Sequence, residues 1–178
     1  HVGLISAGIF SLNQQGLQGA IMQMLAHGIN VVGLFFIADI LLRHTGTREM
    51  EKLGGIRSMN GNFAVLFLIV LLGSVALPLT NGFVGEFLLI NGVYQYNAWY
   101  AALAGLTVIL GAVYMLRAYQ KIMLGERRDS NITFGSIATS DKITLLIVCA
   151  VILVFGVYPK PLNDIAEEAV KGILVNLK

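Results

Sequence analysis

Four long stretches of the chain contain no Asp, Glu, Lys or Arg: residues 2–38, 58–85, 87–116 and 143–159. Apolar residues dominate each stretch, and about 20 consecutive apolar residues are enough for a helix to cross the hydrocarbon core of a bilayer. The pattern therefore predicts an all-α fold, a polytopic bundle of transmembrane helices. The expected spans are residues 17–42, 62–96, 98–119 and 143–158, and residues 1–10 are expected to be a truncated span.

The stretch at 62–96 is too long for one straight crossing. As a single helix it would measure about 52 Å, whereas the hydrocarbon core is about 30 Å thick. Pro78 removes a backbone donor, and Asn81, Gly82 and Gly85 follow it, with Gly82 as the residue that permits a turn. The stretch is therefore either two short spans or one span made of a broken helix.

The distribution of Lys and Arg decides between these two topologies. Most of these residues fall in or beside two predicted loops, 43–61 and 120–142, whereas the predicted turn at 11–16 carries none. If 62–96 crosses once, both basic loops share a side, as the positive-inside rule expects of cytoplasmic loops. We therefore favour a single crossing with one broken helix. The tail at 159–178, with a short amphipathic helix over residues 163–177, then lies on the outer side.

The composition excludes several classes of protein. Charged residues make up 12% of the 178 residues, hydrophobic residues make up 56%, and the net charge is only +2. A soluble enzyme, a disordered chain and a nucleic-acid binder are all excluded by these values. With one cysteine, Cys149, three histidines without metal-site spacing and no glycine-rich nucleotide motif, the chain is expected to hold no cofactor and no metal. The opening on His1, already apolar from Val2, indicates a larger protein cut within a helix.

Glu86 is the most informative polar residue, because it is the only charged residue between Arg57 and Arg117. It follows the proposed helix break by a few residues. A carboxylate in hydrocarbon is costly, so such residues usually face a cavity or a partner and mark ion or proton pathways. Glu86 is therefore a candidate proton-transfer residue. The alternative is a structural carboxylate that pairs with a Lys on a helix outside this chain.

A polar face crosses the predicted span at 17–42. His27 lies near its middle, with Gln23 four residues before it and Asn30 three residues after it, so the three side chains share one helix face. A histidine can change its charge near neutral pH, which favours a hydrated relay over simple core packing. Asp39 lies close to the end of the span, and an interfacial role and a functional role are equally open for it.

Several motifs resemble a known family of membrane proteins. They are HVG at 1–3, QGLQGAIMQMLAHG at 15–28, GG at 54–55, LPLTNGFVGEFLL at 77–89, GAVYML at 111–116 and FGVYPKPL at 155–162. Together they are similar to the C-terminal third of the M-type (chain 4) antiporter-like membrane subunits of bacterial NADH-quinone oxidoreductase, or complex I. Related L-type and N-type subunits and Mrp-type antiporters commonly carry Lys at the position of Glu86, so Glu indicates the M type.

The resemblance implies roles for particular residues. Subunits of this family contain two inverted five-helix repeats, each with a broken helix, and 62–96 matches the second broken helix. Glu86 matches the acidic residue of the exit-side proton site, and His27 and His1 match histidines of a central hydrophilic axis. Gln23 and Asn30 join that axis only because they share the face of His27. The NADH and redox sites of the complex belong to other subunits.

The leading hypothesis is thus a proton-translocating subunit of complex I in the bacterial inner (cytoplasmic) membrane, beside L-type and N-type neighbours. In this reading the chain is part of an enzyme but performs no redox chemistry itself. The alternative is a subunit of an Mrp-type sodium/proton antiporter or of a membrane-bound hydrogenase. A third hypothesis, a membrane scaffold without transport, predicts that Glu86 and the face of His27 lie in dry, apolar surroundings.

Overall fold

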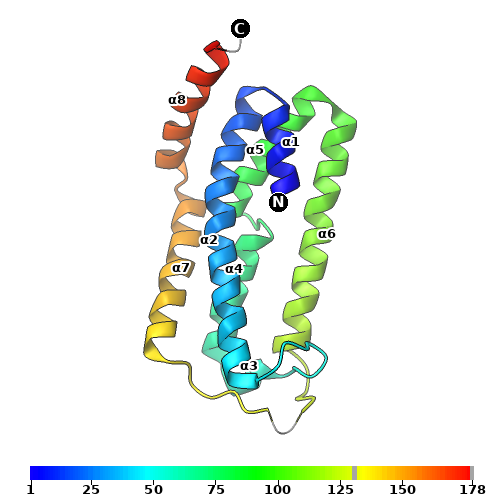
Figure 1. Ribbon diagram of the computed structural model, residues 1–178, viewed down its shortest axis with the longest axis vertical. Coiled ribbons are helices and arrows are strands. Elements are labelled where there is room, and N and C mark those ends of the chain that lie inside the picture. Colours follow the sequence, from blue (N-terminus) through cyan, green and yellow to red (C-terminus); the bar gives the residue numbers. More distant parts are fainter. Residues whose placement is uncertain (130–131, 177–178) are drawn as a thin grey trace.

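The computed structural model describes residues 1–129 and 132–176, and these residues form helices and the turns between them (Figure 1). The predicted all-α class with one broken helix is confirmed. The helices are α1 (Val2–Phe10), α2 (Gln14–Thr45), α3 (Ile56–Met59), α4 (Gly61–Ser74), α5 (Asn81–Tyr96), α6 (Ala98–Met123), α7 (Thr139–Val157) and α8 (Lys160–Asn176).

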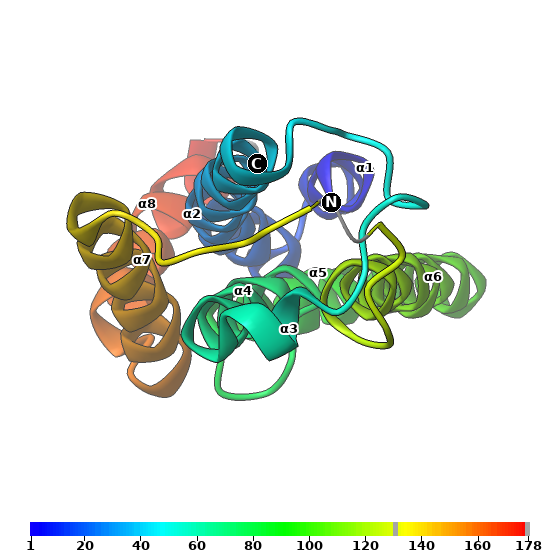
Figure 2. The same ribbon diagram turned by 90° about the horizontal axis from the view of Figure 1, so that it is seen from below.

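Three of these helices, α2, α6 and α7, are long and apolar enough to cross a membrane, and α4 is a shorter apolar helix. Viewed along the bundle, α1 and α2 lie on one side and α4, α5 and α6 on the other, with α7 at one edge (Figure 2). The end of α2, the short α3 and the end of α6 lie at one end of the bundle. The α1–α2 and α5–α6 turns lie at the opposite end (Figure 1).

Helix α2 is longer than the predicted span, because its ends are set by capping residues rather than by hydropathy. The side chain of Asn13 accepts a hydrogen bond from the backbone N–H of Gly16 at 2.8 Å, so the helix begins at Gln14 and the predicted turn at 11–16 is shorter. At the other end Gly46 adopts a left-handed φ of 68°, and its N–H bonds to Leu42 O.

The ends of the other helices also shift. The predicted loop at 120–142 is shorter, because α6 continues to Met123 and α7 already begins at Thr139. Helix α8 begins before the predicted residue 163, and it tolerates Pro161 because the first turn of a helix leaves backbone N–H groups unpaired. Leu177, assigned to the same predicted helix, lies outside the described residues.

The broken helix is α4 followed by α5, and together they cross the bundle once (Figure 1). Ala76 and Leu79 carry the turn between them, with positive φ values of 53° and 76°. The expectation that Gly82 permits the turn was wrong, because Gly82 already lies in the first turn of α5. A Cβ there would come within 2.5 Å of Gly73 O, so this glycine instead allows α5 to approach the end of α4.

Helices α2 and α5 run antiparallel in very close contact. A Cβ added to Gly92 would lie 2.4 Å from backbone atoms of Gly16, and one added to Gly19 would lie 2.7 Å from Leu89 N. Glycines on both helices therefore bring the two backbones together. Towards the end of the bundle that carries α3, a separate core of buried residues such as Ile40, Phe63, Leu71 and Leu145 joins α2, α4 and α7.

We expect Gly92→Ala to destabilise the full-length protein by about 1–3 kcal/mol, since the added methyl group would overlap the backbone of Gly16. The measurement is the midpoint of thermal unfolding of the purified protein in detergent. Gly28→Ala is the matched control, because a Cβ at Gly28 meets nothing within 4 Å. Equal stability of the two variants would contradict the proposed backbone contact.

A small charge network joins the polar ends of the helices. Glu51 forms ion pairs with Lys121 and with Arg128, the latter at 3.1 Å between Oε2 and Nη1. The hydrogen bond from Lys121 and the attraction of both cations lower the pKa of Glu51 below its usual 4.5. A carboxylate with a lowered pKa in the folded protein stabilises it above the unfolded-state pKa, and this contribution is lost as the pH falls through the folded-state value.

We therefore expect Glu51→Gln to lower the unfolding midpoint slightly at neutral pH, and the difference from the unsubstituted protein to shrink on acidification below pH 4.5. High salt should also reduce it, because the network is exposed to solvent. The check is thermal unfolding across pH in low and high salt. A difference that grows on acidification would contradict this assignment.

Candidate proton-transfer site

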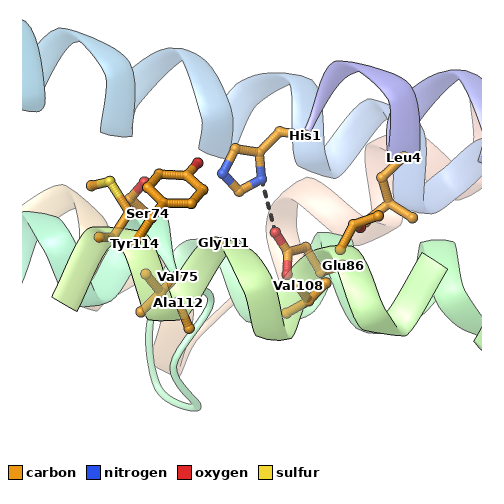
Figure 3. Close-up of a pocket in the computed structure, with 11 residues that line it drawn as sticks. His1, Leu4, Ser74, Val75, Glu86, Val108, Gly111, Ala112 and Tyr114 are labelled. Carbon is orange, nitrogen blue, oxygen red and sulfur yellow. Dashed lines mark ion pairs between the residues drawn. The ribbon is translucent and has the colours of Figure 1, made fainter. Parts of the chain in front are cut away.

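The carboxyl group of Glu86 lies at the centre of the candidate site and is almost completely buried, with 3% of the residue exposed. Its Oε1 lies 2.9 Å from His1 Nδ1 (Figure 3) and also accepts a hydrogen bond from Gln23 Nε2 at 3.3 Å. The other oxygen, Oε2, has no protein partner among the described residues. His1, the N-cap of α1, and Gln23 of α2 thus both reach the carboxyl group of Glu86 on α5.

Gly85 explains how Gln23 reaches the carboxyl group. A Cβ on Gly85 would lie 2.4 Å from Gln23 Oε1 and 2.8 Å from the backbone N and Cα of Gln23. Because this Cβ is missing, α2 can approach α5 closely enough for the amide of Gln23 to lie beside Glu86. The predicted role of Gly85 in the helix break was therefore wrong: it lies within α5 and permits a helix–helix contact.

His27 lies next to His1 rather than next to Glu86. The ring centroids of His1 and His27 are 5.2 Å apart, and the planes are tilted by 46°. The structure therefore orders the ionisable groups as His27, His1 and Glu86. Which nitrogen of each imidazole carries the proton depends on its tautomer, and His1 is charged only when both nitrogens are protonated.

A cavity of about 80 Å³ borders this group and separates it from α6. Each water molecule needs roughly 10–15 Å³ of such space, so several can fit. Ser74, Thr107 and Tyr114 are the uncharged polar residues of its wall, and the hydroxyl-bearing ring of Tyr114 lies near His1 (Figure 3). The sequence did not indicate the role of α6 in this wall, because Thr107 and Tyr114 are isolated within an apolar helix.

The polar face predicted on α2 divides in two. Gln23 faces Glu86, whereas Asn30 lies at the helix break, where its Nδ2 donates to Gly73 O at 3.0 Å. Asn81, at the start of α5, also lies at the break and donates to Ala26 O at 3.5 Å. Asn30 therefore does not join the group of His27, although the two residues share a stretch of helix.

The other polar residues singled out in the sequence lie elsewhere. Asp39 accepts a hydrogen bond from Arg43, and Arg43 also pairs with Asp141. Asp39 therefore belongs to an ion-pair network that joins α2 and α7. Cys149 is buried, with its Sγ 3.6 Å from Leu66 O. Across residues 1–129 and 132–176, no three His, Cys, Asp or Glu side chains are close enough together to hold a metal ion.

Comparison with known proteins identifies the family. The family model described as "NADH:quinone oxidoreductase/Mrp antiporter, TM" matches residues 1–111, which include α1 to α5 and all of the Glu86 group. The chain belongs to this family. The resemblance found in the sequence motifs is thereby confirmed.

Relatives in this family are between a third and two fifths identical to the chain over the aligned residues. NADH-quinone oxidoreductase subunit M of Rickettsia typhi is 38% identical over 176 residues, which are 98% of this chain and 36% of the relative. Subunit M of Rhodobacter capsulatus is 37% identical over 177 residues, 99% of this chain and 35% of the relative. The chain thus spans about a third of the length of these curated relatives.

Two solved structures share the fold. A chain of respiratory complex I from Thermus thermophilus with bound NADH superposes with a TM-score of 0.86 and 34% identity, covering 95% of this chain and 36% of that chain. A chain of the Mrp complex from Dietzia sp. superposes with a TM-score of 0.85 over 95% of this chain and 40% of that chain. At 20% identity the second likeness concerns the fold alone. Family and fold together indicate a membrane protein.

The contact between His1 and Glu86 can be tested by a double-mutant cycle with His1→Gln and Glu86→Gln in the full-length protein. Because the two side chains are in contact and Glu86 is buried, we expect a coupling energy of about 1 kcal/mol or more in the free energy of unfolding. The same cycle between Glu86 and the exposed Glu168 should give additive effects. Additivity of the His1 and Glu86 variants would contradict the contact.

Proposed function

We propose that the chain is the Glu86-bearing part of a proton-translocating membrane subunit of NADH-quinone oxidoreductase, complex I. The single observation that carries the proposal is the buried carboxyl group of Glu86, which is bonded to His1 and borders a cavity with room for water. The relatives that are named subunit M support the choice of complex. In this proposal the chain moves protons, while NADH oxidation and quinone reduction take place on other subunits.

The geometry suggests how a proton would move. The 2.9 Å separation between His1 Nδ1 and Glu86 Oε1 allows a proton to shift between them without changing the net charge of the pair. The ring of His27 lies beside the ring of His1, with 5.2 Å between their centroids, and would exchange protons with it. Glu86 Oε2 lacks a protein donor within residues 1–129 and 132–176, so a cavity water would bond to it and receive or deliver the proton.

The contact between Glu86 and His1 couples the charge of one group to the charge of the other. An ionised carboxylate at this depth is costly unless it is paired, and the pairing with His1 holds only while His1 carries a proton. Removal of the proton from His1 would therefore favour a neutral Glu86. We propose that charge changes elsewhere in the complex shift the protonation of His1 and Glu86 and so drive the uptake and release of protons.

The location follows from the same proposal. The subunit would lie in the bacterial inner membrane, beside L-type and N-type subunits. The end with α3 would face the cytoplasm because Arg43, Arg48, Lys52 and Lys121 gather there, and α8 would lie at the outer side. The shared fold of the Mrp complex chain keeps a sodium/proton antiporter subunit as the second candidate.

Glu86→Gln tests the proposed function in the intact complex. The amide keeps the size and a hydrogen-bonding group but cannot exchange a proton, so proton pumping should fall by about tenfold or more while the complex still assembles. The measurement is NADH-driven acidification of membrane vesicles, with the amount of complex determined in parallel. Glu168→Gln is the control, because Glu168 is exposed on α8. Undiminished pumping in an assembled Glu86→Gln complex would count against the proposal.

A further inference from the structure

One face of α7 lies against the broken helix on both sides of its break. Leu145, Cys149 and Ile152 are buried on this face, and Gly156 continues it at helical spacing. Cys149 Sγ lies 3.6 Å from Leu66 O, in the middle of α4. Because α7 contacts α5 as well as α4, this face begins beside the first half of the broken helix and continues past the break.

Ile152 packs against the last turn of α4. A Cβ added to Gly73 would lie 2.9 Å from Ile152 Cγ2, so the side chain rests directly on the backbone of Gly73. Ile152 is completely buried there, and α4 ends at the next residue, Ser74. The contact therefore fixes where the first half of the broken helix ends relative to α7.

Gly156, one turn further along α7, contacts the start of the second half. A Cβ at Gly156 would overlap Leu79 O and would lie 2.5 Å from the carbonyl carbons of Leu79 and Thr80. A Cα hydrogen takes the place of this Cβ, and weak Cα–H···O contacts of this kind recur where helices pack closely. Thr80 is the N-cap of α5, so α7 touches the residue from which α5 starts.

The turn between the two halves needs such a contact from outside. Ala76 and Leu79 adopt positive φ values, which are unfavourable for residues with a side chain. The N–H and the Oγ1 of Thr80 both donate to Leu77 O, at 3.0 and 2.7 Å. These two bonds lie within the turn. They define its shape, but they do not define its position relative to the neighbouring helices.

The position of this turn affects the proton-transfer group, because Glu86 lies less than two turns of α5 after Thr80. A close-packed interior transmits a displacement instead of absorbing it. Glu86 Oε1 lies 2.9 Å from His1 Nδ1 and 3.3 Å from Gln23 Nε2, and a hydrogen bond is lost beyond about 3.5 Å. A small shift at the start of α5 is therefore enough to break these contacts.

We propose that Gly156 is a positioning residue for the proton-transfer site. Because it has no side chain, α7 can lie directly on the turn, and this contact sets the position of α5 and the distance from Glu86 to His1. The inference rests on the proposed function. Gly156 acts only through the turn, since it does not line the cavity beside Glu86.

Gly156→Ala in the intact complex tests this role. Carbon atoms in contact lie about 3.5–4.0 Å apart, so the added methyl group must displace the turn by about 1 Å. We expect a cryo-EM map to show more than about 3.5 Å between His1 Nδ1 and Glu86 Oε1. Proton pumping per NADH oxidised should fall by about tenfold or more, since displacements of this size disrupt transfer geometry.

A spectroscopic readout distinguishes positioning from simple packing. The infrared carbonyl band that Glu86→Gln removes should shift in frequency in Gly156→Ala, because the hydrogen bonds of the carboxyl group change. Gly61→Ala is the matched control on the same broken helix, since a Cβ at Gly61 meets nothing within 4 Å. It should leave the band and the pumping unchanged.

Leu79→Gly provides a rescue. Glycine adopts positive φ without steric cost, so the carbonyl group of residue 79 can turn away from the added methyl group. The side chain of Leu79 is exposed, so its loss removes little packing. We expect Gly156→Ala combined with Leu79→Gly to recover most of the pumping and the original band. If Gly156→Ala alone does not assemble, the double variant decides: assembly with the original band supports the inference, and failure to assemble overturns it.

Other outcomes would also overturn the inference. Less assembled complex with a normal band and normal pumping per complex would show a packing role alone. Unchanged assembly, band and pumping would show that the contact does not position Glu86, and lost pumping without rescue would show that the turn is not the cause. Unchanged pumping in Glu86→Gln would contradict the proposed function, whereas the distance from His1 to Glu86 in Gly156→Ala would still decide whether Gly156 positions the acid.

Discussion

The carboxyl group of Glu86 can be buried at 3% exposure only because polar groups of two other helices reach it. Burying an ionised carboxylate without a partner is costly, so the contacts with other helices are needed. Helix α1 supplies an imidazole that can exchange a proton with the acid, and α2 supplies an amide donor. The structure therefore depends on the close approach of α1, α2 and α5. Glycines such as Gly85 and Gly92, at which a Cβ would clash, make that approach possible.

The broken helix has a second consequence for the same region. The turn between α4 and α5 holds Ala76 and Leu79 at positive φ, which is unfavourable for residues with a side chain, so the surrounding contacts must stabilise it. Gly156 of α7 provides such a contact, since a Cβ there would lie 2.2 Å from Leu79 O. The break thereby places helix ends within the bundle, where an unbroken helix would present only apolar side chains and bonded backbone.

The sequence was sufficient to predict the helical class, the positions of the long helices and the interruption near Pro78. These predictions depend on local features, namely the length of the uncharged stretches and the missing backbone donor of proline. The thickness of the bilayer then limits how long a helix that crosses it can be. Helix ends were less accurate, because Asn13 and Gly46 act through capping geometry rather than hydropathy. The turn residues were also missed, since nothing in the identities of Ala76 and Leu79 indicates positive φ.

The sequence singled out individual residues of the candidate site but not their arrangement. A lone Glu86 in an apolar stretch is conspicuous, and the motif resemblance also drew attention to His1 and His27. Helical spacing grouped Gln23 and Asn30 with His27, yet tertiary contacts assign Gln23 to Glu86 and Asn30 to the break. Spacing along one helix cannot show which neighbouring helix faces each side chain. For the same reason, the contribution of Tyr114 to the cavity wall could not be foreseen.

Infrared difference spectroscopy of the intact complex tests most directly whether Glu86 gains and loses a proton during turnover. A protonated carboxyl group has a carbonyl stretching band that an ionised carboxylate lacks, and Glu86→Gln identifies which band belongs to this residue. We expect this band to differ between resting and NADH-energised complex, to shift in D₂O and to be missing in the variant. A Glu86 that stays in one protonation state under both conditions would contradict the account.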